Sequence, residues 1–394
     1  EIERKAHALL DALALNDGLS GNRHRLFSAL VAMCDAYRLG TPDTARFDRA
    51  LANAAFVARL VARHLIEVGG PAAVRALCAA PSAFTAHHRL LGAALVHALV
   101  AFVIDVPVTL RNYWSHFELV TLLTVLLSGE LFKHEHLPLN DVFFSLSLQP
   151  AARLVTILLH NFAAPRPMPP NNMLEASSTG FLYHWATNAY DALASATFAH
   201  NSSGAAASAV SAATSGSAAD KKPAPASSVG ATLGDASLLL FLLAVRRGSF
   251  RKTFAAIDSV EVWRALYERL VGVSVLDEPS QLLLYALFRN ASFVEHILAR
   301  VDVERLIEPM LRVLYIGADV NAATHHQYLM LSCLVTLSTN VSFNRSLHLV
   351  SLDDVPWYKT AVLSRITLDS LVVLLVLQTM HRNLTQYRDE ELHL

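Results

Sequence analysis

The clearest repeating pattern of apolar positions lies between Val303 and Tyr315. Apolar residues recur there at the spacing of one helix face, and they are Val303, Leu306, Ile307, Met310, Leu311 and Leu314. This spacing predicts an amphipathic helix. Asp302 is placed to cap its first turn. Pro309 falls inside the pattern and predicts a kink or an early break, because proline lacks the amide hydrogen that a helix interior needs.

The rest of the chain reads as one helix after another, separated by short breakers. The helices expected in the first half span residues 23–37, 44–68, 72–79, 86–104 and 112–131. Glycine and proline fall where these helices should end, and no strand pattern is present. A further helix start near Val260 precedes Val303 by about 43 residues, a spacing within the period of armadillo and HEAT repeats.

These observations predict an all-α fold, an armadillo/HEAT-like α-solenoid of stacked helices. A compact bundle of so many helices would need a core wider than side chains can fill. We divide the chain into an N-terminal helical array (residues 1–199), a low-complexity Ala/Ser-rich insertion (200–231) and a C-terminal helical array (232–394). The insertion has little apolar surface to bury, so we expect it to be disordered.

Composition narrows the classes of protein. Of the 394 residues, 53% are hydrophobic and the formal net charge is −1, so no basic footprint for nucleic acid is present. Three cysteines in apolar surroundings favour a reducing compartment over a disulfide-bonded fold. The densest basic cluster has two interpretations, a solvated helix end or a contact with phosphate or anionic headgroups, and it comprises Arg246, Arg247, Arg251 and Lys252.

Several apolar runs raise the alternative of a multi-pass membrane protein. The longest, from Leu90 to Ile104, stops after 15 residues, whereas a membrane span needs about 20. We therefore expect buried helices of an array. His97, inside this run, is expected to be a hydrogen-bonded core histidine rather than a pH-sensitive group. Because the chain begins at Glu1 without an initiating methionine, we expect it to be a fragment, and we expect its end at Leu394 to be incomplete as well.

No catalytic, cofactor-binding or metal site is predicted. His134, Glu135 and His136 form the nearest metal-like cluster, but the helical zinc motif needs its second histidine four residues after the first, where Pro138 stands. The chain has no P-loop, no nucleophile elbow and no Cys-x-x-Cys motif. An enzyme or metal protein is the weaker rival to a binding protein.

Residues 343–394 carry polar and aromatic residues at irregular spacing around an apolar block, 366–380. Trp357 and Tyr358 are expected to open the helix that holds this block. Asn344 and Ser346, as turn and cap formers, favour a corner between helices. The alternative is a partner-binding patch, since aromatic residues and arginine dominate binding hot spots. That patch would comprise Arg345, His348, Trp357, Tyr358 and Arg388.

Together with matches upstream, this segment resembles the dymeclin family. The matching residues there include Arg300, Asp302, Glu304, Pro309, Tyr315, His325 and His326, with shorter matches back to Gly21 and Asn22. The resemblance implies a non-enzymatic, cytoplasmic scaffold that associates peripherally with the Golgi apparatus, binds other proteins there and supports Golgi organisation and vesicle trafficking. It implies no cofactor and no small-molecule substrate. Family members begin with a Met-Gly sequence suited to N-myristoylation, which no residue of this chain matches.

Overall fold

The computed structural model describes residues 2–40, 45–80, 90–133, 136–170, 232–273, 275–317 and 324–384. Most of these residues are helical, which is consistent with the all-α prediction. Three predicted features lie outside the described residues: the insertion at 200–231, Arg388, and the pair His134 and Glu135.

The first half holds eight α-helices and one π-helical turn among the described residues. They are α1 (Ile2–Ser20), α2 (Asn22–Arg38), α3 (Ala45–His64), η1 (Leu65–Gly69), α4 (Gly70–Ala79), α5 (Leu91–Asp105), α6 (Tyr113–Lys133), α7 (Pro138–Phe144) and α8 (Leu148–Ala163). The predicted starts and ends agree to within a few residues, except that the 86–104 helix begins at Leu91. Gly70 has a φ of 68° and Pro71 follows it, so the chain turns where these two breakers were placed.

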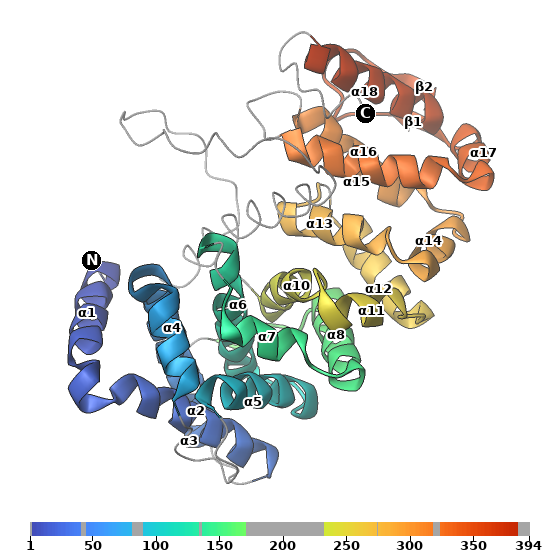
Figure 1. The fold of residues 1–394 in the computed structure, drawn as a ribbon. Helices are drawn as coiled ribbons and strands as arrows, with labels where there is room; N and C mark the ends of the chain where they lie inside the picture. The colour runs from blue at the N-terminus through green and yellow to red at the C-terminus, as the bar shows by residue number, and fades with distance from the viewer. Residues whose placement is uncertain are drawn as a thin grey trace.

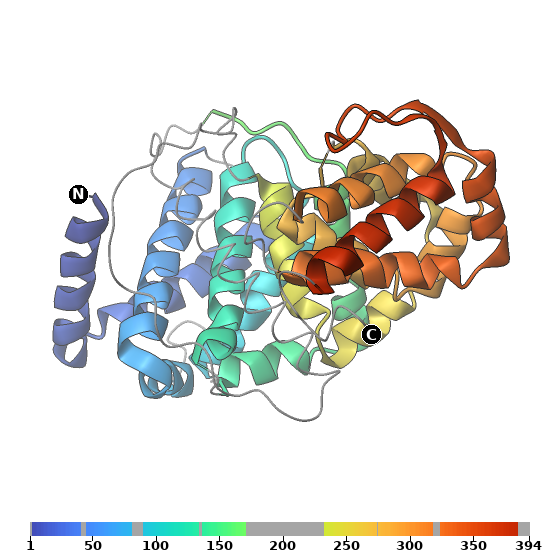
Figure 2. The same cartoon turned by 90° about the horizontal axis from the view of Figure 1, so that it is seen from above.

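The described second half continues with helices and one short hairpin. The helices are α10 (Leu233–Ala244), α11 (Gly248–Ala255), α12 (Val260–Val271), α13 (Glu278–Leu287), α14 (Ala291–Leu298), α15 (Glu304–Gly317), α16 (Thr324–Ser338), α17 (Val341–Leu349) and α18 (Leu368–Arg382). Figures 1 and 2 show the helices following one another in sequence order from one end of an elongated molecule to the other.

Two strands correct the expectation of helices alone. β1 (Ser351–Asp354) and β2 (Ser364–Thr367) pair antiparallel, with Leu352 opposite Ile366. Trp357 and Tyr358 lie in the loop between them, so the prediction that they open a helix is wrong, and α18 begins only at Leu368. Strands of four residues are too short to show the alternation by which sequence patterns reveal them.

Pro309 does not break α15, which runs unbroken from Glu304 to Gly317. The predicted early break is therefore wrong. The apolar face of this helix is fully buried, with Leu306, Ile307 and Met310 at 0% exposure. Burial of such a face supplies most of the stability of a helix in a folded protein, and it offsets the hydrogen bond lost at proline.

Polar contacts connect the helices on either side of residues 171–231. The backbone N–H of Leu233, the first residue of α10, donates to the Tyr113 hydroxyl at 2.8 Å. Asn161 Nδ2 on α8 donates to Ser237 Oγ on α10 at 3.3 Å. These contacts place α10 directly against α6 and α8.

Within the first half, α3 and α6 share a buried ion pair between Arg59 Nε and Glu118 Oε2 at 2.7 Å.

In the second half, two series of helices pack on one another at every third position. α10 contacts α13 and α13 contacts α16, while α12 contacts α15 and α15 contacts α18. The first series begins at residues 233, 278 and 324, intervals of about 45 residues. A short motif also recurs, with leucine at two positions followed by Asn-x-Ser-Phe. Its members are Leu284, Leu287, Asn290, Ser292 and Phe293 in one copy and Leu334, Leu337, Asn340, Ser342 and Phe343 in the other.

Both asparagines of this motif cap a helix. The Asn290 side chain accepts from the Phe293 N–H at the start of α14, and Asn340 accepts from the Phe343 N–H at the start of α17. Both phenylalanines are buried. The repeated sequence therefore makes the same corner twice.

Among the described residues, no single helix has both the length and the apolarity to cross a membrane. The pair α7 and α8 meets these criteria only when taken together, and it is bent by 94° at the break.

The buried histidine is not the expected one. His97 is exposed on α5, so its prediction as a core residue is wrong. His116 on α6 has 0% exposure instead, and neither of its ring nitrogens has a hydrogen-bond partner. Burial lowers the pKa of His116 to about 3, with a smaller contribution from the charge of Arg166.

We expect His116 to weaken the fold in mild acid. Its folded pKa lies below its unfolded value, so the unfolded chain takes up a proton first, and stability present above pH 6.5 is lost as the pH falls. Between pH 7 and pH 5 the loss should be about 2 kcal/mol. His116→Leu should remove this part of the pH dependence, as measured by urea unfolding at both pH values. His160→Leu, at an exposed position of α8, should leave the slope unchanged; equal slopes in the wild type and His116→Leu would contradict the assignment.

Candidate partner-binding site

Two residues of the predicted patch, Arg345 and His348, are exposed on α17. Phe343 and Leu347 of the same helix are buried, which turns the opposite face toward solvent. His348 Nδ1 lies 2.6 Å from Asp369 Oδ2, at the start of α18. The pKa of Asp369 is lowered, first by a hydrogen bond from the Thr367 side chain and also by the charge of His348. Arg345 and His348 therefore lie exposed on the same helix, and His348 is held by Asp369.

The aromatic residues of the patch pack against α15 instead. Trp357 Nε1 donates to Glu308 Oε1 at 3.0 Å, and its ring centroid lies 5.8 Å from that of Tyr315. Tyr358 is 8% exposed, and its ring lies 5.1 Å from Tyr315. The Tyr315 hydroxyl accepts from the Lys359 backbone N–H at 2.9 Å. These contacts fix the hairpin loop onto α15.

The remaining corner residues also make structural contacts. Asn344 Nδ2 donates to the Ser338 carbonyl at 2.8 Å, at the last residue of α16. Ser346 Oγ donates to the Phe343 carbonyl within α17. Asn344 thus ties α17 to the end of α16. Of the five predicted residues, two are packed in the hairpin loop, two are exposed on α17, and Arg388 lies outside the described residues.

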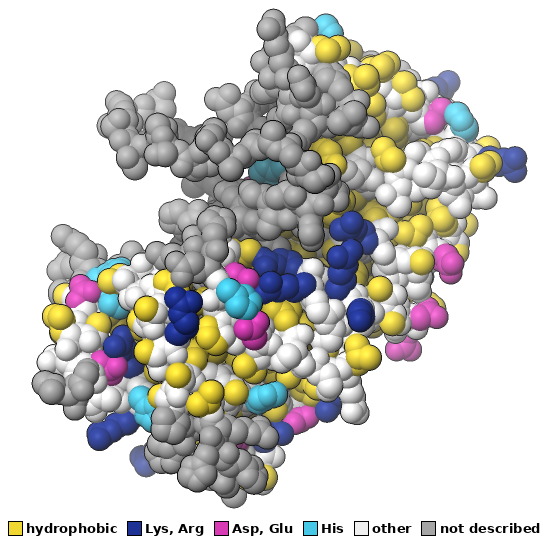
Figure 3. Space-filling view, viewed as in Figure 1, with side chains coloured by type: hydrophobic (Ala, Val, Ile, Leu, Met, Phe, Trp, Pro, Cys, Tyr) yellow, Lys and Arg dark blue, Asp and Glu magenta, His cyan; other side chains and the backbone are white. Residues whose placement is uncertain are grey.

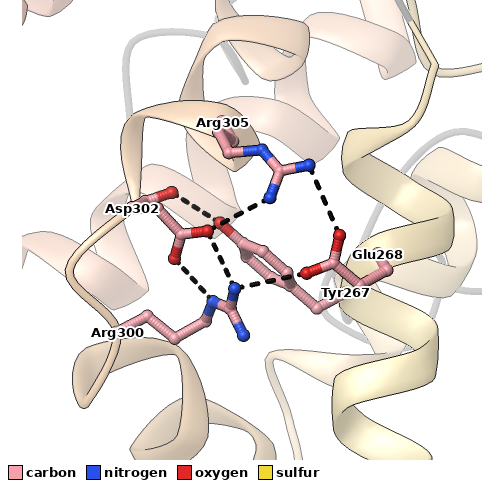
Figure 4. Close-up of polar contacts among 5 residues, drawn as sticks. All are labelled: Tyr267, Glu268, Arg300, Asp302 and Arg305. Carbon is pink, nitrogen blue, oxygen red and sulfur yellow. Dashed lines mark hydrogen bonds and ion pairs between the residues drawn. The ribbon is translucent and has the colours of Figure 1, made fainter.

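A second polar cluster joins α12 to the loop before α15 (Figure 4). The hydroxyl of the buried Tyr267 donates to the Asp302 carbonyl at 2.5 Å. Both guanidinium edge nitrogens of Arg300 reach the Asp302 carboxylate, Nε at 2.7 Å and Nη2 at 2.8 Å. The Arg300 guanidinium carbon lies 3.8 Å from the Tyr267 ring centroid. Arg305 completes the cluster, with Nη1 on Asp302 and Nη2 on Glu268.

This cluster holds its charges fixed. The Arg300 hydrogen bond lowers the pKa of Asp302 to about 2, and the same bond raises the pKa of Arg300. Burial raises the pKa of Tyr267 to about 12, so its hydroxyl stays a donor at neutral pH. The Asp302 carboxylate accepts from two arginines, and this use replaces its predicted role as a cap of α15. The arrangement is suited to holding helices together.

The geometry of the described residues offers little support for a metal site or a reactive thiol. The described residues contain no group of three or more His, Cys, Asp or Glu side chains arranged to hold a metal ion. His136 pairs with Glu130 and Asp141, and these two carboxylates raise its pKa. All three cysteines are buried, and burial raises their thiol pKa values, that of Cys78 to about 11.

Sequence reasoning missed the Tyr267 cluster and the Arg59–Glu118 pair. A signal for the first was present, because the spacing between the Val260 and Val303 helices already suggested adjacent repeats, and Glu268 and Arg305 lie on those helices. For the second, the signal was Glu118 within the largely apolar α6. Neither signal identifies the partner residue, since the pairing depends on how the helices pack.

Comparisons with known proteins agree on one family. The model of the family described as "Dymeclin: Dyggve-Melchior-Clausen syndrome protein" matches residues 1–394. Dymeclin of Xenopus laevis is 29% identical over 329 residues, covering 76% of this chain and 46% of that protein. Dymeclin of Mus musculus is 28% identical over 343 residues, covering 79% of this chain and 48% of that protein. The chain spans about half the length of the curated relatives it matches. No solved structure matches it.

Substitutions at Trp357 and Arg345 should distinguish a residue that stabilises the fold by packing from one that lies only on the surface. Trp357→Ala removes the bond to Glu308 and the contact with Tyr315, and we expect it to lower the free energy of unfolding by about 2–3 kcal/mol. Arg345→Ala, on the exposed face of α17, should change it by less than about 0.5 kcal/mol. Urea unfolding measures both. A large loss for Arg345→Ala would assign that residue to the corner as well.

A double-mutant cycle should detect the Tyr267 cluster. We expect Tyr267→Phe to cost about 1 kcal/mol of unfolding free energy, because it deletes one hydrogen bond without changing the ring. Combined with Arg300→Met, the two changes should show a coupling of about 0.5–3 kcal/mol, because the Tyr267 hydroxyl and the Arg300 guanidinium both hold Asp302. Strictly additive effects in urea unfolding would mean that the two bonds to Asp302 act independently. Tyr267→Phe with Arg49→Met, an exposed residue of α3, is the matched control and should be additive.

Proposed function

Because this chain belongs to the dymeclin family, we propose that it is a non-enzymatic scaffold that supports Golgi organisation and vesicle trafficking through protein–protein contacts. The observation that carries the proposal is the match of the family model to residues 1–394. The relatives themselves are about twice as long, so the proposal concerns the part of a scaffold that this chain represents.

The proposed architecture is an armadillo/HEAT-like solenoid. Three observations support it: α10, α12, α13 and α15 each pack on the third helix after them, α10, α13 and α16 begin at intervals of about 45 residues, and the Asn-capped corner recurs at α14 and α17. In such an array each repeat contacts only its neighbours, which leaves a long surface available to partners. This surface is what a scaffold needs.

On that surface, Arg345 and His348 are the residues we assign to partner contact. Both are exposed, they lie one turn apart on α17, and arginine is enriched in binding hot spots. Trp357 and Tyr358 support this region from behind by holding the hairpin loop on α15. The proposed contact surface is therefore the exposed face of α17.

We place the protein in the cytoplasm with peripheral attachment to the Golgi. N-myristoylation of the family's Met-Gly start is the proposed anchor, and a single acyl chain gives only marginal, reversible membrane binding. The rival class is a multi-pass membrane protein, for which only the bent pair α7 and α8 meets the length and composition of a span among the described residues.

Localisation and extraction test the proposal together. Full-length protein tagged at its C-terminus should colocalise with a Golgi marker and move to the supernatant after an alkaline carbonate wash, because peripheral contacts are released by this treatment. The double variant Arg345→Ala, His348→Ala should show a smaller Golgi fraction at unchanged unfolding free energy. Arg49→Ala serves as the surface control.

Each readout has its own contrary result. Retention in the carbonate pellet would support membrane spans and contradict the peripheral scaffold. A wash-released Golgi signal that the α17 double variant leaves unchanged would retain the scaffold and remove α17 as its contact surface.

A further inference from the structure

Basic residues gather where α10 turns into α11. Arg246 and Arg247 end the turn after α10, and Arg251 and Lys252 are exposed in α11. Figure 3 shows basic side chains grouped in the middle of one face of the molecule, beside histidine and acidic side chains. Among the described residues, the ion pair recorded for this cluster joins Arg247 Nη2 to Glu130 Oε2. Positive charge is therefore in excess at this corner.

Three hydrogen-bond donors at the corner are buried without an acceptor. Within the described residues, Arg246 Nη1, Arg247 Nε and Ser249 Oγ have no hydrogen-bond partner. They belong to a stretch of four residues, so the unmet donors are concentrated in one turn. Buried polar groups in folded proteins nearly always have a partner, and each exception calls for an explanation such as a bound ion. The guanidinium group presents its donors in a planar fork that matches phosphate oxygens.

Glu130 does not supply the missing acceptor. Its carboxylate already accepts from Asn140, contacts His136 and pairs with Arg247. Burial and the charge of Arg247 lower the pKa of Arg246, and the charge of Glu130 opposes this shift. This one carboxylate already serves an arginine, an asparagine and a histidine.

The corner is held in one conformation. Gly248 has a φ of 71°, and a Cβ at this position would lie 2.9 Å from the Phe144 carbonyl oxygen, so only glycine fits. The Arg247 guanidinium carbon lies 4.5 Å from the Phe144 ring centroid, which positions that side chain. α11 begins at Gly248 with no acidic residue in its first turn, so its free N–H groups add to the positive potential. The donors are thus arranged before any ligand arrives.

We propose that Arg246, Arg247 and Ser249 form a binding site for a phosphate-class oxyanion, either a soluble phosphate or the phosphorylated headgroup of a lipid. Arg251 and Lys252, exposed on the following turn, raise the local concentration of such anions. The site is separate from the α17 surface and does not depend on the proposed scaffold function.

Calorimetric titration of the full chain with inorganic phosphate tests the site. Wild-type protein should bind phosphate saturably, while chloride at equal ionic strength gives no such signal. Arg246→Gln should weaken binding about ten-fold or more, the loss of a charged hydrogen bond, and Arg49→Gln should leave it unchanged. Equal phosphate binding by the wild type and Arg246→Gln would overturn the proposal.

Thermal unfolding separates binding from a structural role. Without phosphate, Arg246→Gln should melt at or above the wild-type temperature, because it removes a buried, unpaired donor beside another positive charge. A marked fall in melting temperature without phosphate would mean that Arg246 stabilises the fold and would contradict the proposal. Ser249→Ala, a small change at the same corner, provides the second test should Arg246→Gln fail to fold, and it should also weaken phosphate binding.

Vesicles distinguish the two sources of phosphate. Vesicles of phosphatidylcholine with a phosphatidylinositol monophosphate should sediment the wild type but not Arg246→Gln if the ligand is a lipid headgroup, and inorganic phosphate should compete. Phosphate binding in calorimetry without vesicle binding would assign the site to a soluble phosphate. If the wild type binds neither inorganic phosphate nor the vesicles, the proposed site is overturned.

Discussion

The structure depends on a constraint set by its most apolar helices, which carry apolar residues on more than one face. In α6 and α10 nearly every side chain is buried, including positions on opposite sides of each helix. Such a helix is stable in water only when neighbours cover it on several sides. α6 is covered by α3, α5, α7 and α10, and α10 by α6, α8 and α13. The order in which helices stack follows from this need for coverage.

Polar groups caught between these helices need partners, and the partners specify how the helices meet. Arg59 is 1% exposed, so its charge is tolerable only because Glu118 lies opposite. Burial raises the pKa of Glu118, whereas the Arg59 charge lowers it, and the direct ion pair indicates a charged carboxylate. Breaking such a pair on one side leaves an uncompensated buried charge, which is costly. The Tyr113–Leu233 and Asn161–Ser237 bonds serve the same purpose where α10 joins the first half.

Features that depend on residues close together in the sequence were predictable, and features that depend on packing were not. Helix limits were largely predictable, because Gly70 and Pro71 or the pattern from Leu306 to Leu314 act within a few residues. Burial inside a helix was not predictable. The apolar run around His97 does not reveal which of its faces meets solvent, and His116 lies among mixed polar and aromatic residues yet is buried. The hairpin was missed because its strands are four residues long and mostly exposed. For the predicted patch, the sequence could not show that Trp357 and Tyr358 pack while Arg345 and His348 are exposed, because this division depends on the position of α15.

The two arginine clusters show how a structural contact differs from a binding site. Around Tyr267, the Asp302 carboxylate accepts from both arginines, and Glu268 takes the remaining interactions of each. A network closed in this way positions α12 against α15 and leaves no strong demand for a ligand. At the α10–α11 corner, Glu130 pairs with Arg247, while buried donors of Arg246, Arg247 and Ser249 have no acceptor. Only the basic corner was visible in the sequence as a cluster, and the balance of donors and acceptors in three dimensions distinguishes it from the Tyr267 cluster. That balance assigns the first cluster to folding and the second to binding.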